Sequence, residues 1–178
     1  MEERLKVLFF NNTLRRWHFS ALLAESGMSR ERLNHFLTRL RKDNFVNRVK
    51  PKEKMPYYVT NRESSKFRLE KRLYGLRMLE KLFQHLNSCK GIKTAILFGS
   101  FARGDWSQSS DIDLFIYGDD SDFEKSKLET ELGREIQLFT YSDPQQMKKQ
   151  LDPKVISNIA KGFHITESIE PFEVSIYG

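Results

Sequence analysis

The chain has 178 residues, of which 30% are charged and 39% hydrophobic, and its net charge is +6. This length allows one domain or two small ones, and the composition is that of an ordinary folded protein with enough apolar material for a core. A single cysteine, Cys89, excludes an internal disulfide framework. The apolar run near the start is too short for a signal peptide or a membrane span, so we expect a cytoplasmic protein with no membrane partner.

The charge is divided unevenly along the chain. Residues 1–92 contain 21 Lys and Arg against 9 Asp and Glu, a net of +12, whereas residues 93–178 contain 9 against 15, a net of −6. Opposite net charge in the two halves indicates two domains with different partners. The basic half is suited to a polyanion, and the acidic half to a metal ion and a nucleotide.

The first 60 residues predict helices followed by a hairpin. Apolar residues recur at helical spacing, and Ser29 is placed to cap the third helix. Trp17 and His18, before the second helix, are expected in the core and on the surface, respectively. The expected elements are helices at 2–10, 21–25 and 30–42 and strands at 45–49 and 57–60 around a basic turn. This pattern resembles a winged helix-turn-helix domain, which we expect over residues 1–62.

The resemblance implies that the third helix enters the major groove of DNA and that the basic turn contacts phosphate. Residues 1–60 contain 13 Lys and Arg against 6 Asp and Glu, which favours contact with DNA or RNA. A solvated basic face and a protein-interaction module are the alternatives. The residues expected to bind nucleic acid are Arg30, Arg32, Arg39, Arg41 and Lys42 on the helix and Lys50, Lys52 and Lys54 in the turn.

A connecting helix is expected within residues 63–90. Leucine and phenylalanine recur at spacings of three and four from Leu69 to Leu86, and the helix is expected to end near Ser88. The apolar stripe predicts packing on the following sheet or pairing with a second copy of the chain in a homodimer. Gly75 within the stripe allows a close approach, at a cost of about 1 kcal/mol relative to alanine in a helix interior.

The second half is organised around the stretch AILFGSFARGDWSQSSDIDLFIY. It predicts a buried strand that ends at Gly99, a short helix, a polar loop and a second strand. The amides of Gly99 and Ser100 at the helix start favour an anion, and Arg103 can add a charged donor. Alternation along the second strand puts Asp111 and Asp113 on one face, where two like charges favour a shared divalent cation such as Mg²⁺.

This stretch resembles the GS-x10-DxD signature of the nucleotidyltransferase superfamily that includes DNA polymerase β, in particular its minimal nucleotidyltransferase branch. The matching residues are Gly99, Ser100, Arg103, Gly104, Asp105, Ser110, Asp111, Ile112, Asp113 and Leu114. The resemblance covers about residues 67–166. It implies an α+β protein in which the winged helix-turn-helix is followed by a nucleotidyltransferase domain at 91–178, with a mixed sheet flanked by helices.

The same resemblance implies a chemistry. Asp111 and Asp113 would be the catalytic pair that holds Mg²⁺, and a nucleoside monophosphate would pass from a nucleoside triphosphate to an acceptor hydroxyl. The branch includes antitoxins that modify a partner toxin, so a partner protein is one acceptor to consider. The nucleotide-binding residues expected on this basis are Gly99, Ser100, Arg103 and Ser110.

A third carboxylate on the next strand normally completes the site in this family, within a pattern like RxVDLV. That strand is expected at 134–140, REIQLFT, and the matching position is Gln137. An amide is a poor Mg²⁺ ligand and cannot act as a general base, so the chain departs from the family here. Glu135, on the same face of the strand, is either a substitute ligand or a solvated charge at the strand end.

The sequence therefore leaves three functions open. The first is Mg²⁺-dependent nucleotidyl transfer. The second is a DNA-binding regulator or antitoxin whose transferase domain only binds a nucleotide or a partner protein, and the third is a structural module.

After the signature, the expected elements are a helix at 121–132 ended by Gly133, helices opening at Pro144 and Pro153, a closing helix and strand within 156–166, and an edge strand in the tail at 168–178.

Overall fold

The computed structural model describes residues 2–172, which divide into two compact units between Lys71 and Arg72. The boundary falls inside helix α4 (Ser65–Met78). Within the described residues, no helix has the length and apolar character needed to cross a membrane. The edge strand expected in the tail falls mostly at 173–178, outside the described residues.

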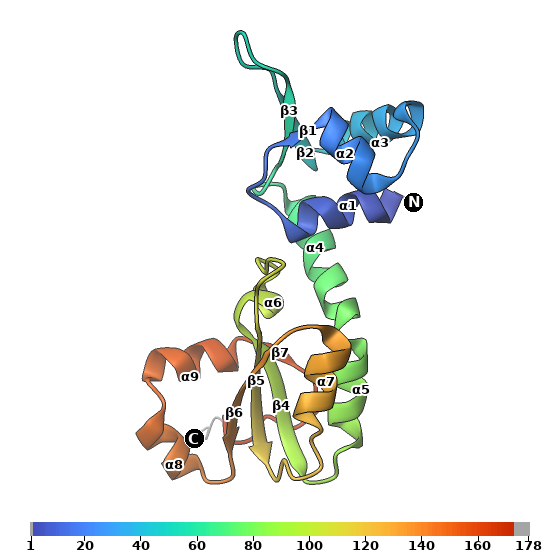
Figure 1. Cartoon of the computed structure of the whole chain (residues 1–178). Coiled ribbons are helices and arrows are strands. Elements are labelled where there is room, and N and C mark those ends of the chain that lie inside the picture. The colour runs from blue at the N-terminus through green and yellow to red at the C-terminus, as the bar shows by residue number, and fades with distance from the viewer. Residues whose placement is uncertain (1, 173–178) are drawn as a thin grey trace. The chain divides into compact units, whose positions relative to one another are not determined.

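The first unit contains three helices and a small sheet (Figure 1). Its elements before α4 are α1 (Glu2–Asn11), β1 (Trp17–His18), α2 (Phe19–Ser26), α3 (Arg30–Lys42), β2 (Val46–Val49) and β3 (Tyr57–Thr60). The strands form an antiparallel sheet in the order β1-β3-β2. The predicted helices and the two hairpin strands are confirmed, whereas β1 was not predicted because two residues carry no readable periodicity.

The helical spacing of leucines explains why α3 packs as it does. Leu33, Leu37 and Leu40 are buried along one side of the helix. The Ser29 hydroxyl accepts the backbone N–H of Arg32 at 3.3 Å and so caps the helix, as predicted. Trp17 is fully buried in the core, whereas His18 is exposed, also as predicted.

The connecting segment differs from the prediction, because it forms two helices instead of one. Helix α4 ends at Met78, and α5 (Glu80–Ser88) begins after Leu79, whose backbone leaves the helical region at φ −96° and ψ 9°. Leu79 is fully buried, so the apolar spacing continues through the break and hides it in the sequence. Farther back on α4, Leu69 and Leu73 are exposed, so the stripe is not buried along its whole length.

The second unit is built on a mixed sheet with the strand order β6-β5-β4-β7. Strands β5 and β6 are parallel, and the other two pairs are antiparallel. The expected α+β class and mixed sheet are therefore confirmed. The remaining elements are β4 (Ile92–Phe98), α6 (Gly99–Arg103), β5 (Ile112–Gly118), α7 (Lys125–Leu132), β6 (Ile136–Tyr141), α8 (Pro144–Gln150), α9 (Pro153–Ala160) and β7 (Phe163–His164).

Helices cover both faces of this sheet. Figure 1 shows α8 and α9 on one side and α5 and α7 on the other. On the α8 and α9 side, Met147, Leu151 and Ile159 pack in one buried cluster with Ile96 and Phe115 of the sheet. A strand buried on both faces needs a continuous apolar run, and such runs occur at residues 95–98 in β4 and at residues 114–117 in β5.

Helix α7 starts four residues later than predicted. Residues 121–124 form a turn, in which the backbone N–H of Ser121 donates to the side chain of Asp119 at 3.0 Å and that of Phe123 donates to the carbonyl of Asp120 at 2.9 Å. The bond that the Asp119 side chain accepts competes with the first helical turn. Gly133 ends the helix with φ +62°, as predicted.

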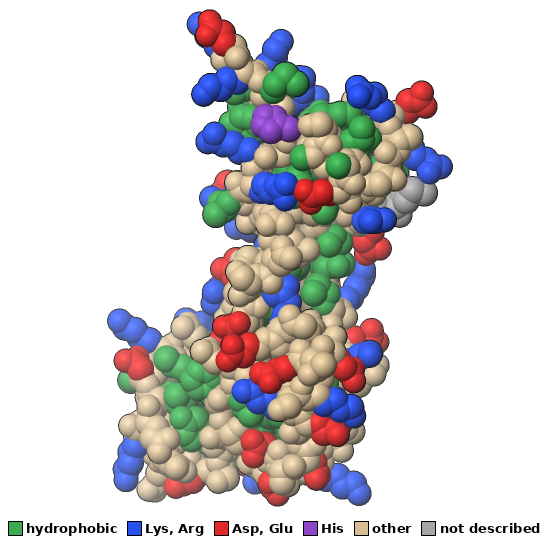
Figure 2. All heavy atoms as spheres, viewed as in Figure 1, with side chains coloured by type: hydrophobic (Ala, Val, Ile, Leu, Met, Phe, Trp, Pro, Cys, Tyr) green, Lys and Arg blue, Asp and Glu red, His purple; other side chains and the backbone are tan. Residues whose placement is uncertain are grey.

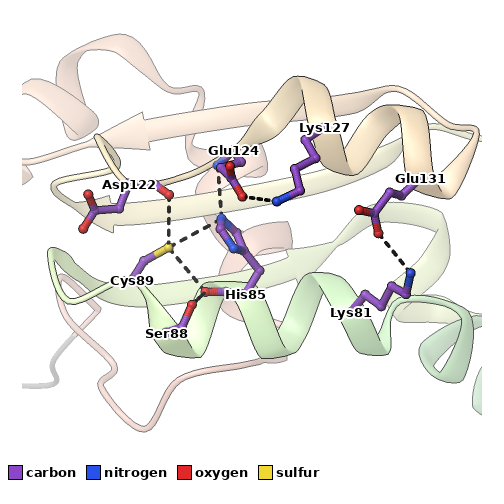
Figure 3. A network of polar contacts seen from close by, with 8 residues as sticks. All are labelled: Lys81, His85, Ser88, Cys89, Asp122, Glu124, Lys127 and Glu131. Atoms are coloured by element: carbon purple, nitrogen blue, oxygen red, sulfur yellow. Dashed lines mark hydrogen bonds and ion pairs between the residues drawn. The ribbon is translucent and has the colours of Figure 1, made fainter.

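A polar network joins α5 to the segment before α7 (Figure 3). His85 Nε2 accepts the backbone N–H of Glu124 at 3.1 Å, and Cys89 Sγ lies 3.3 Å from the carbonyl of His85 and 3.6 Å from that of Asp122. Burial, followed by the charges of Asp122 and Glu124, raises the pKa of the Cys89 thiol. Cys89 is therefore a buried thiol whose ionisation is disfavoured.

We predict that Gly75→Ala destabilises the second unit. A Cβ at Gly75 would lie 2.5 Å from Nε1 and 3.2 Å from Cδ1 of the buried Trp106. Overpacking costs about 1–3 kcal/mol, which exceeds the gain of about 1 kcal/mol in helix propensity. Urea unfolding should show a net loss near 1 kcal/mol, and the exposed Arg77→Ala on the same helix should stay within about 0.5 kcal/mol of wild type. A more stable Gly75→Ala protein would contradict this packing.

Candidate functional site

The centre of the candidate site is the side chain of Asp113 on β5. The carboxylate accepts the backbone N–H of Ser100, and it occupies the space in which a side chain at Gly99 would lie, since a Cβ there would be 2.6 Å from Asp113 Cγ. Gly99 also has φ +66°, a conformation that L-residues rarely adopt. The turn at Gly99–Ser100 and the aspartate strand are therefore in direct contact.

The register of the sheet explains this contact. Asp113 pairs with Phe98, the last residue of β4, so the turn that follows Phe98 comes over the start of β5. Ile112 is fully buried on the opposite face, as strand alternation requires. Asp111, immediately before β5, is exposed.

The electrostatics of the site favour a cation. Burial raises the pKa of Asp113, the negative charge of Asp111 raises it further, and Arg103 and the Ser100 amide act in the opposite direction. Arg103 Nε itself donates to Asp105 at 3.1 Å, in an exposed ion pair. A half-buried carboxylate beside a second negative charge is stabilised when a divalent ion binds between them.

Gln137 occupies the position beside Asp113 on the neighbouring strand. The parallel pairing of β5 with β6 matches Asp113 to Gln137 and Ile112 to Ile136. The same register places the exposed Glu135 beside Asp111, and the Ile112 amide donates to the Glu135 carbonyl at 2.9 Å. The residue beside Asp113 on the neighbouring strand is therefore an amide and not a carboxylate.

The residues present fit one Mg²⁺ ion. Within residues 2–172, no group of three or more His, Cys, Asp or Glu side chains is arranged to hold a metal. Magnesium is usually held by one or two carboxylates together with substrate phosphates, and Asp111 and Asp113 supply such a pair. The side chain beside this pair on β6 is the amide of Gln137, a poor Mg²⁺ ligand.

The sequence profile described as "Polymerase beta, Nucleotidyltransferase" matches residues 80–168, which is half of the chain. The chain belongs to this family. It is also similar to a Methanocaldococcus jannaschii protein named "Putative protein adenylyltransferase MJ0604", with 64% identity over 28 residues. That stretch is 16% of this chain and spans 28% of the relative's length.

Arg134 holds the loop between α6 and β5 through its guanidinium group. Its Nη1 donates to the carbonyls of Ser107, Gln108 and Ser110 at 3.1, 2.9 and 2.8 Å. Ser110 Oγ in turn accepts the Ser107 amide at 2.8 Å. This loop leads directly into Asp111, so Arg134 fixes the approach to the aspartate strand. We did not predict this contact; the only sequence signal was the arginine that opens the third-strand pattern.

An aromatic stack supports the same arginine. The Arg134 guanidinium lies 5.2 Å from the ring centre of Phe101 and 5.7 Å from that of Trp106. The two rings are parallel, with centres 5.3 Å apart, and both are fully buried. Tyr74 also stacks on Trp106, with ring centres 6.2 Å apart. The predicted nucleotide residue Ser110 thus lies in a loop built on buried aromatic rings.

We predict that Arg134→Ala loosens this loop. A hydrogen bond from a charged donor makes a net contribution of about 1.5–3 kcal/mol to stability. We count the three bonds of Arg134 as about one such bond, because they share one nitrogen. The free energy of unfolding should fall by about 2 kcal/mol, and the amides of Ser107 and Ser110 should exchange with solvent faster. Arg134→Lys should recover part of the loss, whereas Arg103→Ala, at an exposed position, should not change this exchange. Unchanged exchange in Arg134→Ala would mean that the loop is held by other contacts.

The basic residues expected to bind nucleic acid are all exposed, in the first unit. Those of α3 differ in their partners: Arg39 forms an ion pair with Glu2 of α1 at 3.0 Å, and the Arg30 guanidinium lies 5.8 Å from the ring centre of Phe19. Lys50, Lys52 and Lys54 lie in the loop of the β2–β3 hairpin, and Figure 2 shows Lys and Arg side chains around this hairpin.

Proposed function

We propose that this protein is a Mg²⁺-dependent nucleotidyltransferase that moves a nucleoside monophosphate from a nucleoside triphosphate to an acceptor hydroxyl. The observation that carries the proposal is the contact of the Asp113 carboxylate with the Gly99–Ser100 turn, beside the negative charge of Asp111, which raises the pKa of Asp113. Asp111 and Asp113 would hold the metal. Bound Mg²⁺ would neutralise phosphate charge and lower the pKa of the acceptor hydroxyl.

The chain's own residues would bind and orient the triphosphate. The Ser100 amide already donates to Asp113, so we assign the Ser100 hydroxyl and the Arg103 guanidinium to the phosphate oxygens. In the transfer, the acceptor oxygen forms a bond to the α-phosphorus, the bond to the β-phosphate oxygen breaks, and pyrophosphate leaves with its electron pair. The acceptor proton passes to solvent or to an aspartate, since the Gln137 amide cannot accept it.

The relative's name supports a narrower version of the proposal. It specifies an adenylyl group and a protein acceptor, although the matched stretch is a small part of that relative. We accordingly propose ATP as the first donor to test and a hydroxyl group on a partner protein as the first acceptor. An antitoxin that modifies a toxin is the version of this activity that the resemblance to the minimal branch suggests.

A second candidate function follows from Gln137. With no carboxylate beside Asp113, the site has the ligands to bind Mg²⁺ and nucleotide but lacks the usual group that activates a hydroxyl. In this version the second unit senses a nucleotide, and the protein acts as a DNA-binding regulator or antitoxin.

We further propose that the first unit is a winged helix-turn-helix domain that binds DNA. The support is its element order, its antiparallel sheet, and the exposed cations of α3 and the β2–β3 hairpin. The proposed organisation is this domain at 1–62, a connecting helical segment at 63–90 and the transferase domain at 91–178.

Calorimetric titration with non-hydrolysable ATP and GTP analogues, with and without Mg²⁺, tests the site. Binding that requires Mg²⁺ and disappears in the Asp111→Asn/Asp113→Asn double variant supports it, and no binding at millimolar nucleotide would overturn it. Transfer of α-labelled nucleotide then separates the two candidates. Gln137→Asp should raise Mg²⁺ affinity in either case; if wild type binds nucleotide without turnover, the sensor version is supported.

A further inference from the structure

The cations of α3 lie on two different sides of the helix. Arg39 is neutralised by Glu2 of α1, at 3.0 Å. Arg41 lies two residues farther along, and a rotation of about 100° per residue puts it on the other side of the helix. Neither Arg41 nor Lys42 forms an ion pair with any other residue in the described part of the chain.

Arg41 and Lys42 line a groove between the end of α3 and strand β2. The groove has a volume of about 460 Å³, and its walls are formed by Thr38, Arg41, Lys42, Val46, Asn47 and Arg48. Arg48 is exposed on β2, the edge strand of the sheet, and it too has no ion-pair partner within residues 2–172. No acidic residue lines the groove, so three positive charges face it without compensation.

The neutral groups of the groove suit the same kind of ligand. Asn47 is exposed and offers amide N–H donors. Thr38 Oγ1 donates to the Asn34 carbonyl at 2.8 Å, which fixes the orientation of this side chain at the groove wall. Guanidinium groups match phosphate oxygens in geometry. The two guanidinium groups and one ammonium group carry three positive charges, which is more than one small anion would neutralise. The arrangement therefore fits a run of phosphates.

We propose that this groove binds the sugar-phosphate backbone of duplex DNA, through Arg41, Lys42 and Arg48. The inference rests on the proposed DNA-binding function of the first unit and makes it specific: Arg48 is added to the contacts, and Arg39 is removed from them. Backbone contacts fix the position of a protein on DNA without reading its sequence. The groove therefore contributes affinity and salt dependence, and base recognition is left to other exposed side chains of α3.

Fluorescence anisotropy of the full chain with a labelled random-sequence 30-base-pair DNA duplex, measured over a salt series, tests the proposal. The variants are Arg41→Gln and Arg48→Gln, with Arg68→Gln, at an exposed position of the first unit outside the groove, as the control. Each groove variant should weaken binding about tenfold at fixed salt and reduce the slope of log K against log salt by about 1. Arg68→Gln should leave both unchanged. Arg48→Lys, which keeps the charge, should retain most of the affinity.

Three results would overturn the inference. Wild-type binding by both groove variants, with a loss only in a Lys50→Gln/Lys52→Gln/Lys54→Gln protein, would place the DNA on the hairpin and leave the proposed DNA-binding function intact. Tighter binding of a duplex RNA of equal length, lost in the same groove variants, would change the class of ligand. No binding of wild type to either duplex at low salt would overturn both the inference and the proposed function. Circular dichroism checks that each variant is folded. If Arg48→Gln does not fold, Arg41→Gln and Arg48→Lys still test the proposal.

Discussion

Asp113→Asn is expected to remove Mg²⁺-dependent nucleotide binding and to lower nucleotide transfer roughly 1,000-fold. A metal ion supplies several kcal/mol of transition-state charge stabilisation, and each 1.36 kcal/mol is a factor of ten in rate. An asparagine has nearly the same shape but cannot provide the second negative charge. Titration calorimetry with an ATP analogue and transfer of labelled nucleotide measure the two losses.

The same substitution separates function from stability. Asp113 is half-buried and its pKa is raised by burial and by Asp111, so its charge is unfavourable in the metal-free protein. The melting temperature of Asp113→Asn should therefore equal or exceed that of wild type. Asp122→Asn, at an exposed position in the turn after the far end of β5, should change neither property. Unchanged nucleotide binding in Asp113→Asn would place the nucleotide elsewhere.

Gly99→Ala is expected to destabilise the second unit and to abolish nucleotide binding. Alanine at φ +66° costs about 1–2 kcal/mol, and the added Cβ would collide with the Asp113 carboxylate, for a total of about 2–4 kcal/mol. Nucleotide binding should be lost as well, because Asp113 must move. Urea unfolding and calorimetry measure the two effects.

Gly133→Ala is the matched control for this prediction. Gly133 has nearly the same backbone angle, φ +62°, but a Cβ there would meet nothing within 4 Å. It should therefore show only the conformational cost of about 1–2 kcal/mol and keep nucleotide binding. Equal effects of the two substitutions would mean that the contact between Gly99 and Asp113 is unimportant.

Much of the fold could be predicted from local patterns. Alternation, leucine spacing and the capping residue Ser29 were sufficient for α3, for β4 and for the hairpin. The break at Leu79 could not be predicted, because a buried residue at the break preserves the apolar spacing on both sides. The late start of α7 reflects a turn in which the Asp119 side chain accepts the Ser121 amide and the Asp120 carbonyl accepts the Phe123 amide. These bonds depend on the folded turn and leave no pattern in the sequence.

The candidate site, too, could be predicted from the sequence only in part. Alternation along the strand correctly placed Asp113 and Ile112 on opposite faces. It could not reveal that the Asp113 carboxylate occupies the space in which a side chain at Gly99 would lie. That contact depends on the register between β4 and β5, which the spacing of the signature does not specify. Arg134 was missed for a similar reason, since its hydrogen bonds join residues 24–27 positions apart.

The two tryptophans of the chain provide an optical probe of how it unfolds. Trp17 is buried in the first unit and Trp106 in the second. A Trp17→Phe or a Trp106→Phe protein would therefore have one emitter, and its fluorescence would report on one unit alone. Coincident denaturation midpoints for the two proteins would be expected if the units unfold as one cooperative body, whereas separate midpoints would mean that one unit stays folded after the other has unfolded.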